Sequence, residues 1–314
     1  MKHVKFIAKR LIIMVFTLLV VSFFVFMLIR LAGVDPITVL TGSRKSSEAQ
    51  RQELRVQFNL DKPLLEQYGI WLKGVVQGDF GIDYQKKQSV STILTERMPI
   101  TLGLVLMSSV IAVAIALPAG ILCAIKKNTW LDSLLSTIML FFTSTPGFVS
   151  SILLLLIVVK VNPSYSFSGT YHTTGEYFER LFFPALALSF SMIALIGRIV
   201  RSNMIEQMKQ GYITTTRAKG MGTGNVVMKH AFHNAVIPVL TVSTLLFGGC
   251  IANAVLVEEV FSLPGLGSAL ITAIQNSNYP IIQALILVLT AIFAILNLIV
   301  DILYVAIDPR IKLK

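Results

Sequence analysis

The sequence contains little charge. Only 14% of its 314 residues are Asp, Glu, Lys or Arg, whereas 54% are hydrophobic and the mean hydropathy is +0.75. Because an average soluble domain carries about 25% charged residues, this composition argues against a soluble globular enzyme. The formal net charge is +11. In a soluble chain that excess would suggest nucleic-acid binding, but in an apolar chain it first suggests a membrane protein with a basic cytoplasmic face.

Cysteine is scarce as well. The two cysteines, Cys123 and Cys250, both lie inside apolar runs. Two thiols form at most one disulfide, which excludes the disulfide framework of a small secreted protein. We interpret both as small packing residues.

Motifs for nucleotide binding and metal chemistry are also missing. No Gly-Lys dipeptide occurs, so the chain has no Walker A loop, and the glycine-rich stretch at 220–224 lacks a lysine and a preceding strand. There is no His-Glu-x-x-His motif, and Asp301 is the only acidic residue expected at membrane depth. We therefore expect no catalytic, cofactor or metal site on this chain, and an intramembrane enzyme is a disfavoured alternative.

Long apolar runs are what the sequence does contain. A helix needs about 20 apolar residues to cross the hydrocarbon core. Residues 260–300 carry no charge, but prolines, glycines and asparagines interrupt the first half, so only the second half is long enough. The sequence predicts an all-α polytopic membrane protein with six transmembrane helices, at 11–29, 98–125, 133–159, 181–197, 234–257 and about 281–300.

The distribution of charge predicts the orientation. With six spans both termini lie on one side, which carries 15 Lys and Arg against 4 Asp and Glu, and the other side carries 12 of each. The positive-inside rule makes the first side cytoplasmic. The basic residues before the first span are similar to the start of a signal peptide, but its apolar run is too long for one, so we expect an uncleaved helix.

Few polar residues interrupt the spans. A secondary transporter or channel would need charged coupling residues at mid-membrane, so we regard that class as a disfavoured alternative and expect an external energy source. The third span contains Thr143, Ser144, Thr145 and Pro146, which either form a structural kink or line a substrate pathway. Asn253 in the fifth span is interpreted as an interhelical hydrogen-bonding residue.

Two features lie at the outer end of the fifth span. Glu258 is interpreted as structural, with an outer gate or a receptor contact as the alternative. Pro264 and Gly265 belong to a turn that should lead into a short helix at 268–276. That helix is either a scoop near the mouth of a translocation pathway or an interfacial packing helix.

The longest polar insert, 33–97, lies on the outer side. It contains a helix-compatible segment at 47–58, a break at 59–63, and a segment at 64–76 whose apolar residues share one helical face. We expect a small extracytoplasmic cap of short helices.

The cytoplasmic loop between the fourth and fifth spans is basic. Residues 199–209 should extend the fourth helix, 212–219 should form a short helix, and 226–234 a second one. Between the two short helices, Gly220, Gly222 and Gly224 predict a tight turn, because glycine adopts positive φ at little cost. Such a loop suits docking to a soluble partner, although a solvated connector with a positive-inside excess would also fit.

Residues 211–241, GYITTTRAKGMGTGNVVMKHAFHNAVIPVLT, resemble the cytoplasmic coupling loop of ABC importer permeases. The similarity is to the oligopeptide/dipeptide/nickel transport family, in the permease type with a large extracytoplasmic loop after the first helix. Further stretches resemble the same family: NLDKPLLEQYGIWLKGVVQGDFGIDY, RMPIT, TSTPGF, EEVFSLPGLG and NLIVDILYVAIDPR. Two departures are Thr214-Thr215-Thr216, where a Glu-Ala-Ala start is common, and Asn278, where an Asp is common.

The resemblance implies a type I ABC importer transmembrane-domain fold. Its implied parts are an N-terminal tail and first helix (1–32), the cap (33–97) and a five-helix permease core (98–314) with cytoplasmic coupling helices at 202–233. The loop would enter a cleft on an ATPase, where Gly220 allows the backbone to turn closely. The implied coupling residues are Tyr212, Thr216, Arg217, Ala218, Lys219, Gly220, Met221, His230 and Asn234, with Arg217, Lys219 and His230 as polar contacts and Ala218 and Met221 as apolar ones.

The resemblance also implies partners and a cargo. The partners would be a second homologous permease subunit, two ATPase subunits that bind ATP and Mg, and an extracytoplasmic substrate-binding protein, all at the cell membrane and in contact with its lipid. No nucleic acid is expected. Short peptides are the implied substrate, and nickel or a metal–chelator complex is the alternative. The spans contain no His/Cys/Met cluster, which disfavours a pathway for a bare ion.

Overall fold

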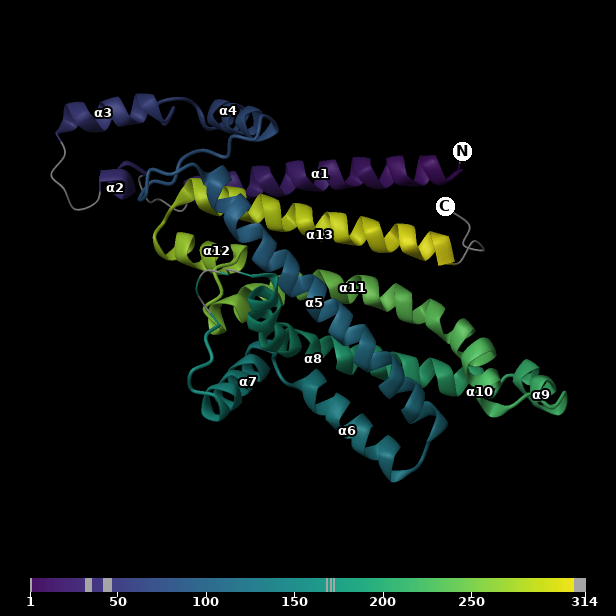
Figure 1. The fold of residues 1–314 in the computed structure, drawn as a ribbon. Coiled ribbons are helices and arrows are strands. Elements are labelled where there is room, and N and C mark those ends of the chain that lie inside the picture. The colour runs from purple at the N-terminus through teal and green to yellow at the C-terminus, as the bar shows by residue number, and fades with distance from the viewer. Residues whose placement is uncertain are drawn as a thin grey trace. The chain divides into compact units, whose positions relative to one another are not determined.

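The computed structural model describes residues 2–31, 36–41, 47–167, 169, 171 and 173–307, and these are helical almost throughout (Figure 1). An isolated antiparallel bridge joins Ile82 and Ser89. The helices are α1 (Lys2–Leu31), α2 (Pro36–Thr41), α3 (Glu48–Gln57), α4 (Leu64–Val76), α5 (Val90–Ile125), α6 (Trp130–Ser144), α7 (Gly147–Val161), α8 (Thr174–Gln207), α9 (Gly211–Ala218), α10 (Thr223–Asn225), the π-helix η1 (Val226–Phe232), α11 (His233–Val260), α12 (Leu266–Gln275) and α13 (Tyr279–Ile307).

The chain divides into two compact units. The first unit comprises Met1–Thr101 and Pro264–Ala294, and the second comprises Leu102–Leu263 and Ile295–Lys314. The first unit therefore contains the helices of the predicted cap and α12, and the second contains the predicted coupling loop.

Among the described residues, four helical stretches are long and apolar enough to cross a membrane: Ile7–Leu31, Val90–Ile125, Thr174–Gln207 and Tyr279–Ile299. The third of these extends well beyond the predicted run 181–197, because the Thr173 side chain caps its start and it continues to Gln207 as expected. The fifth predicted run lies in α11, an unbroken helix of 28 residues.

The third predicted span is not one continuous helix. It consists of α6 and α7, which are bent by 110° relative to each other, far more than the expected kink. Thr145 is extended (φ −90°, ψ 125°) and Pro146 follows as the N-cap of α7. The physical reason is that proline lacks an N–H donor and drives the preceding residue out of the helical conformation.

An aromatic cluster joins α1 to α4 in the first unit. Phe26, only 1% exposed, packs against the ring of Tyr68 with centroids 5.5 Å apart, and Trp71 lies 6.2 Å from Phe26. The Tyr68 hydroxyl also forms a hydrogen bond of 2.8 Å with the Ser22 hydroxyl. Tyr68 and Trp71 of the apolar face predicted for 64–76 therefore pack on α1, whereas Leu64 and Leu65 are exposed, and α4 has the predicted bounds.

The contacts of Asn278 explain why an asparagine fits at this position, where an aspartate is common in the family. Its side-chain amide donates to the Asp83 carboxylate at 2.5 Å, and its oxygen accepts from the Tyr84 N–H at 3.4 Å. Asn278 and Asp83 are only 2% and 3% exposed. An aspartate at position 278 would place a second carboxylate against Asp83, whereas the amide supplies the donor that this buried acid needs.

In the second unit α8 packs against α6, α7 and α11. A close approach to α5 occurs at Gly120, where a β-carbon would lie 2.6 Å from the Gly197 carbonyl oxygen and 2.7 Å from the Val200 β-carbon. Only glycine fits there, because protein interiors are packed as tightly as organic crystals.

We predict that Gly120→Ala destabilises the protein by about 1–3 kcal/mol, because the new methyl group would collide with backbone that cannot move aside. Gly197→Ala is the matched control, since its β-carbon would meet the flexible end of Met139 at 2.7 Å. Thermal unfolding of the purified variants in detergent measures the difference. Equal unfolding midpoints for Gly120→Ala and the wild type would contradict the close packing of α5 on α8.

Candidate functional site

The segment after α8 is held by a small apolar core of its own. Ile213 of α9 is 1% exposed, and Val226 and Val227 of η1 are 0% and 3% exposed. Helix α9 contacts η1, which in turn contacts α8 and α11. The loop is therefore a packed element with one buried face, not a freely solvated connector.

Tyr212 connects three helices at the base of this element. Its hydroxyl donates to the side-chain oxygen of Gln207 at the end of α8, at 2.7 Å, and accepts from the Asn234 amide of α11, at 3.1 Å. Asn234 also donates to the His230 carbonyl at 3.0 Å. Two of the predicted coupling residues, Tyr212 and Asn234, thus brace α9 against the helices on either side.

Gly220 ends α9 in the left-handed conformation, with φ +79°. Its N–H donates to the Arg217 carbonyl at 2.9 Å, and the Lys219 N–H donates to the Thr215 carbonyl at 3.1 Å, which is a common way to close a helix C-terminus. The prediction of a three-glycine turn is corrected in part. Gly222 has φ −62° as the N-cap of α10 and Gly224 lies inside α10, so only Gly220 uses the left-handed region.

The residues around Gly220 form an exposed surface. Arg217, Ala218, Lys219, Gly220 and Met221 are all exposed, with Met221 at 44%. This surface, residues 217–221, combines two cations with an apolar side chain. Thr216 and His230 are half-buried, and the Thr216 hydroxyl donates to the Tyr212 carbonyl at 2.7 Å, so Thr216 supports the helix beneath this surface.

The second short helix is not separate, contrary to expectation. Residues 226–232 form the π-helix η1, which continues directly into α11 and past Pro238. A π-helix accommodates extra residues within a helical path and is frequent at functional sites. The loop is consequently joined rigidly to α11 instead of being separated from it by a break.

Of the predicted pathway residues, Thr143 and Ser144 end α6, and Thr145 and Pro146 form the break before α7. The Thr143 and Thr145 hydroxyls donate to carbonyls of α6, at Met139 and Phe141, both at 2.8 Å.

Asn253 lies against the same break. A β-carbon at Gly147, the first residue of α7, would lie 3.4 Å from the Asn253 side-chain oxygen. Its amide donates to the Gly249 carbonyl at 2.9 Å. This bond lies within α11, whereas we expected one between helices.

Glu258, Pro264 and Gly265 are placed at the end of α11 and the start of α12. Glu258 is fully buried, and its backbone carbonyl accepts from the Leu263 N–H at 2.8 Å. Whether its carboxylate is structural or serves as a gate or receptor contact stays a prediction. Pro264 is half-buried and Gly265 is buried as the N-cap of α12, with bounds close to the expected helix.

The Gly265 turn is fixed by residues from the start of α5. The Gly265 carbonyl accepts from the Arg97 guanidinium at 3.3 Å, and the Leu266 N–H donates to the Thr101 hydroxyl at 2.8 Å. Within the first unit, RMPIT therefore contacts the PGLG end of the stretch EEVFSLPGLG, and both stretches resemble the family.

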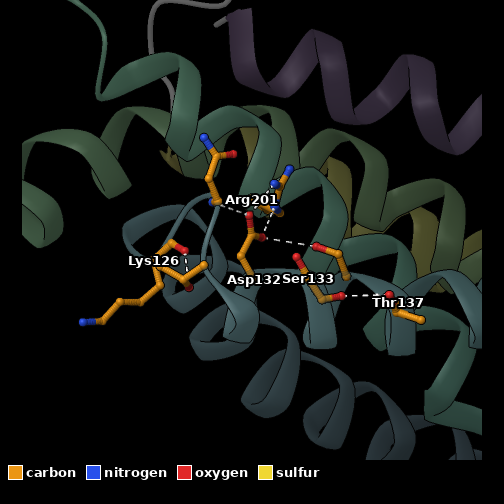
Figure 2. A network of polar contacts seen from close by, with 8 residues as sticks. Lys126, Asp132, Ser133, Thr137 and Arg201 are labelled. Atoms are coloured by element: carbon orange, nitrogen blue, oxygen red, sulfur yellow. Dashed lines mark hydrogen bonds and ion pairs between the residues drawn. The ribbon is translucent and has the colours of Figure 1, made fainter.

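An ion pair that the sequence did not reveal joins α6 to α8 (Figure 2). The Arg201 guanidinium donates to both oxygens of Asp132, from Nε at 2.6 Å and from Nη2 at 2.8 Å. Asp132, 4% exposed, also accepts from the Asn128 N–H at 3.0 Å and the Ser136 hydroxyl at 3.3 Å. The only signal in the sequence was an isolated acid just before the third apolar run.

These contacts form a connected path through the second unit. Asp132 anchors α6 to Arg201, which lies six residues before Gln207 on α8. Gln207 is bonded to Tyr212, and Tyr212 to Asn234 of α11. A displacement of α9 would therefore act on α6, α8 and α11 together.

We predict that Asp132→Asn lowers stability by about 2 kcal/mol, because it removes one charge of a pair whose acid is buried while Arg201 keeps partial access to solvent. Glu66→Gln is the matched control, because it removes one charge of the exposed Lys62–Glu66 pair, with side chains 37% and 52% exposed. We expect that change to stay within about 0.5 kcal/mol. Unfolding midpoints of the purified variants test both expectations, and an Asp132→Asn midpoint as high as the control's would refute the role of the pair.

Comparison with known proteins agrees with this geometry. The family of binding-protein-dependent transport system inner membrane components matches residues 116–313, and its N-terminal companion family matches 3–105. The chain is 35% identical over 312 residues to the glutathione transport system permease protein GsiC of Escherichia coli (strain K12), covering 98% of this chain and 99% of the relative. It is 33% identical over 298 residues to a peptide transport system permease protein of Brucella abortus (strain 2308), covering 94% and 95%.

A solved structure shares the fold. The inward-facing MetNI methionine ABC transporter includes a chain that superposes with a TM-score of 0.56 and 18% identity, covering 69% of this chain and 96% of that chain. This likeness establishes the type I importer permease fold, and the family match confirms the resemblance inferred from the motifs. The chain belongs to the family of binding-protein-dependent transport system inner membrane components, the multi-pass permease subunits of ABC importers.

Proposed function

We propose that this chain forms half of the translocation pathway of an ABC importer for short peptides. The support for the substrate is the pair of relatives named for glutathione and peptide transport, together with similarity over nearly the full length of both. Glutathione is itself a short peptide. Nickel or a metal–chelator complex is the alternative substrate.

The proposed topology has six crossings, made by α1, α5, the α6–α7 pair, α8, α11 and α13. Both termini would lie in the cytoplasm, as the charge distribution predicts. Residues 1–32, 33–97 and 98–314 would then be the tail with its first helix, the extracytoplasmic cap and the permease core. The partners would be a second permease, two ATPase subunits that bind ATP and Mg, and a binding protein on the outer side.

The surface formed by residues 217–221 would dock into the ATPase. The observation that carries this assignment is that the surface is exposed and basic, yet rests on α9, which is braced to α8 and α11 through Tyr212. When two ATPases close on ATP, both coupling loops would move together and the membrane helices would switch from inward-facing to outward-facing. A braced loop passes such a displacement to the spans, whereas a free loop would absorb it.

Glycine substitutions test the docking role. We predict that Gly220→Trp leaves the protein in the membrane but lowers ATP-dependent uptake at least about tenfold, because a large side chain would block close approach in the cleft and left-handed backbone costs a non-glycine residue about 1–2 kcal/mol. Gly222→Trp is the matched control, since neither glycine has an atom within 4 Å of its β-carbon position and only Gly220 has positive φ.

The measurement is uptake and ATP hydrolysis by the complete transporter in proteoliposomes with its binding protein. Hydrolysis that continues while uptake stops indicates uncoupling at the loop. Normal uptake by the Gly220→Trp transporter would exclude the proposed contact, and so would purification in mild detergent without any ATPase subunit.

The substrate is tested separately. We predict that the binding protein of this system binds di- to tetrapeptides, including glutathione, and that these compete for uptake while nickel salts do not. A calorimetric binding screen followed by competition with labelled peptide measures this. Tight binding of nickel or a nickel chelate, with no peptide bound, would replace the peptide proposal and leave the ATPase contact intact.

A further inference from the structure

A cavity in the first unit is lined by several buried polar atoms that have no hydrogen-bond partner, on side chains whose other atoms contact neighbours such as Tyr84. Its volume is about 310 Å³. Among the described residues, five of the buried side-chain atoms that lack a hydrogen-bond partner belong to its lining: Arg30 Nε and Nη1, Gln67 Oε1, Trp71 Nε1 and Gln283 Nε2. Buried polar groups in native proteins are nearly always paired, so a cluster of unpaired ones in one cavity indicates a missing ligand.

Three helices place these groups. Arg30 lies near the end of α1, with its guanidinium carbon 5.0 Å from the ring centre of Phe26 and 6.0 Å from that of Tyr279. Gln67 on α4 is 8% exposed, and Gln283 on α13 is 4% exposed. The Gln67 amide nitrogen already donates to the Lys62 carbonyl at 2.8 Å, so its free oxygen is the atom left for a ligand.

The unpaired atoms favour an anionic ligand. Four are nitrogens that carry N–H donors, and two of them belong to a guanidinium, whose planar donor set matches the oxygens of a phosphate. The cavity lining also contains two hydrogen-bond acceptors, Gln67 Oε1 and the carboxylate of Asp79. These acceptors could bind an N–H or O–H donor on the group attached to the phosphate. A phosphate diester that bears a head group with an N–H or O–H donor satisfies both sets.

An apolar groove continues from the cavity. Its volume is about 290 Å³, and its lining is almost entirely apolar, including Leu19 of α1, Val75 of α4 and Leu287 of α13. Phe80 lines both the groove and the cavity.

The two hollows also share helix faces. On α1, residues 22, 26 and 30 follow one another at four-residue spacing, and on α13 residues 283, 287 and 291 do the same. Each series runs from the groove into the cavity. These positions lie within the apolar stretches Ile7–Leu31 and Tyr279–Ile299. With both stretches crossing the membrane, the groove would lie at membrane depth and the cavity toward one membrane surface.

We propose that the cavity and groove together bind one glycerophospholipid, with its phosphate diester at Arg30, Trp71 and Gln283 and one acyl chain in the groove. Basic pockets between membrane helices bind phospholipid head groups by this chemistry. A bound lipid would fix α4 of the cap against α1 and α13. The site depends on α1 and α13 spanning the membrane, not on the peptide substrate or the ATPase contact.

The test counts lipid on the complete transporter. The complex is purified, delipidated in detergent, returned to defined phosphatidylethanolamine, phosphatidylglycerol or phosphatidylcholine, and examined by native mass spectrometry. The wild type should retain one phospholipid per copy of this chain, with phosphatidylcholine held least because its head group lacks a donor. Arg30→Gln should lower occupancy about tenfold, since it removes the charge-assisted hydrogen bonds to the phosphate.

Two further variants keep the proposal falsifiable. Leu287→Trp should expel the acyl chain while leaving Arg30 in place, and so lower lipid occupancy even if Arg30→Gln fails to fold. Lys73→Gln is the matched control, because Lys73 is an exposed cation on α4 outside both linings, and it should leave occupancy unchanged.

Three results would overturn the lipid site. The first is a wild type that retains no more lipid than Arg30→Gln and Leu287→Trp, which would show that water and not lipid fills the cavity. The second is displacement of the lipid by inorganic phosphate with no effect of Leu287→Trp, which would indicate a free-anion site. The third is a cross-link from Leu287→Cys to the second permease subunit, which would show that protein fills the groove. Uptake by the Gly220 variants is independent of all three.

Discussion

The constraint behind this structure is that hydrocarbon offers no hydrogen-bond partner to a peptide group. Every N–H and C=O at membrane depth must be paired within the protein, and a helix achieves this within one segment. The break between α6 and α7 shows how an exception is accommodated. Proline removes a donor, the chain bends by 110°, and the Thr143 and Thr145 hydroxyls donate to carbonyls near the end of α6. The same constraint makes unpaired groups around Arg30 informative, because they are the kind of feature that a membrane protein avoids.

Two sets of side-chain polar contacts lie near helix ends in the second unit and brace the predicted coupling loop. Asp132 and Arg201 join α6 to α8, and the Tyr212 hydroxyl joins α8 to α11. These contacts brace the start of α6, the cytoplasmic part of α8 and the start of α11. Such an arrangement allows rigid helices to tilt about their braced ends, which is the kind of motion that a change between inward-facing and outward-facing states requires.

Local patterns allowed many elements to be predicted from the sequence. Helix α4 was bounded correctly because Pro63 precedes it and one face is apolar, and α9 and α12 were found from the glycines and prolines beside them. The break at Pro146 was recognised, but its angle was not, since proline in a membrane helix is compatible with anything from a mild kink to a reversal. The Asp132–Arg201 pair was missed because its partners are 69 positions apart and counting charges assigns only a side of the membrane.

The net charge shows what the structure adds to a count of charged residues. The positive-inside rule treats all 15 Lys and Arg on the predicted cytoplasmic side alike, but the structure distinguishes three of the described ones by what they contact. Arg201 forms an ion pair with Asp132, whereas Arg217 and Lys219 are exposed beside Gly220. Exposed charges steer a partner and set orientation more than they add affinity. The strength of the proposed ATPase contact should therefore come from Met221 and from the close turn at Gly220, with the two cations selecting an acidic cleft and aligning the loop as it enters.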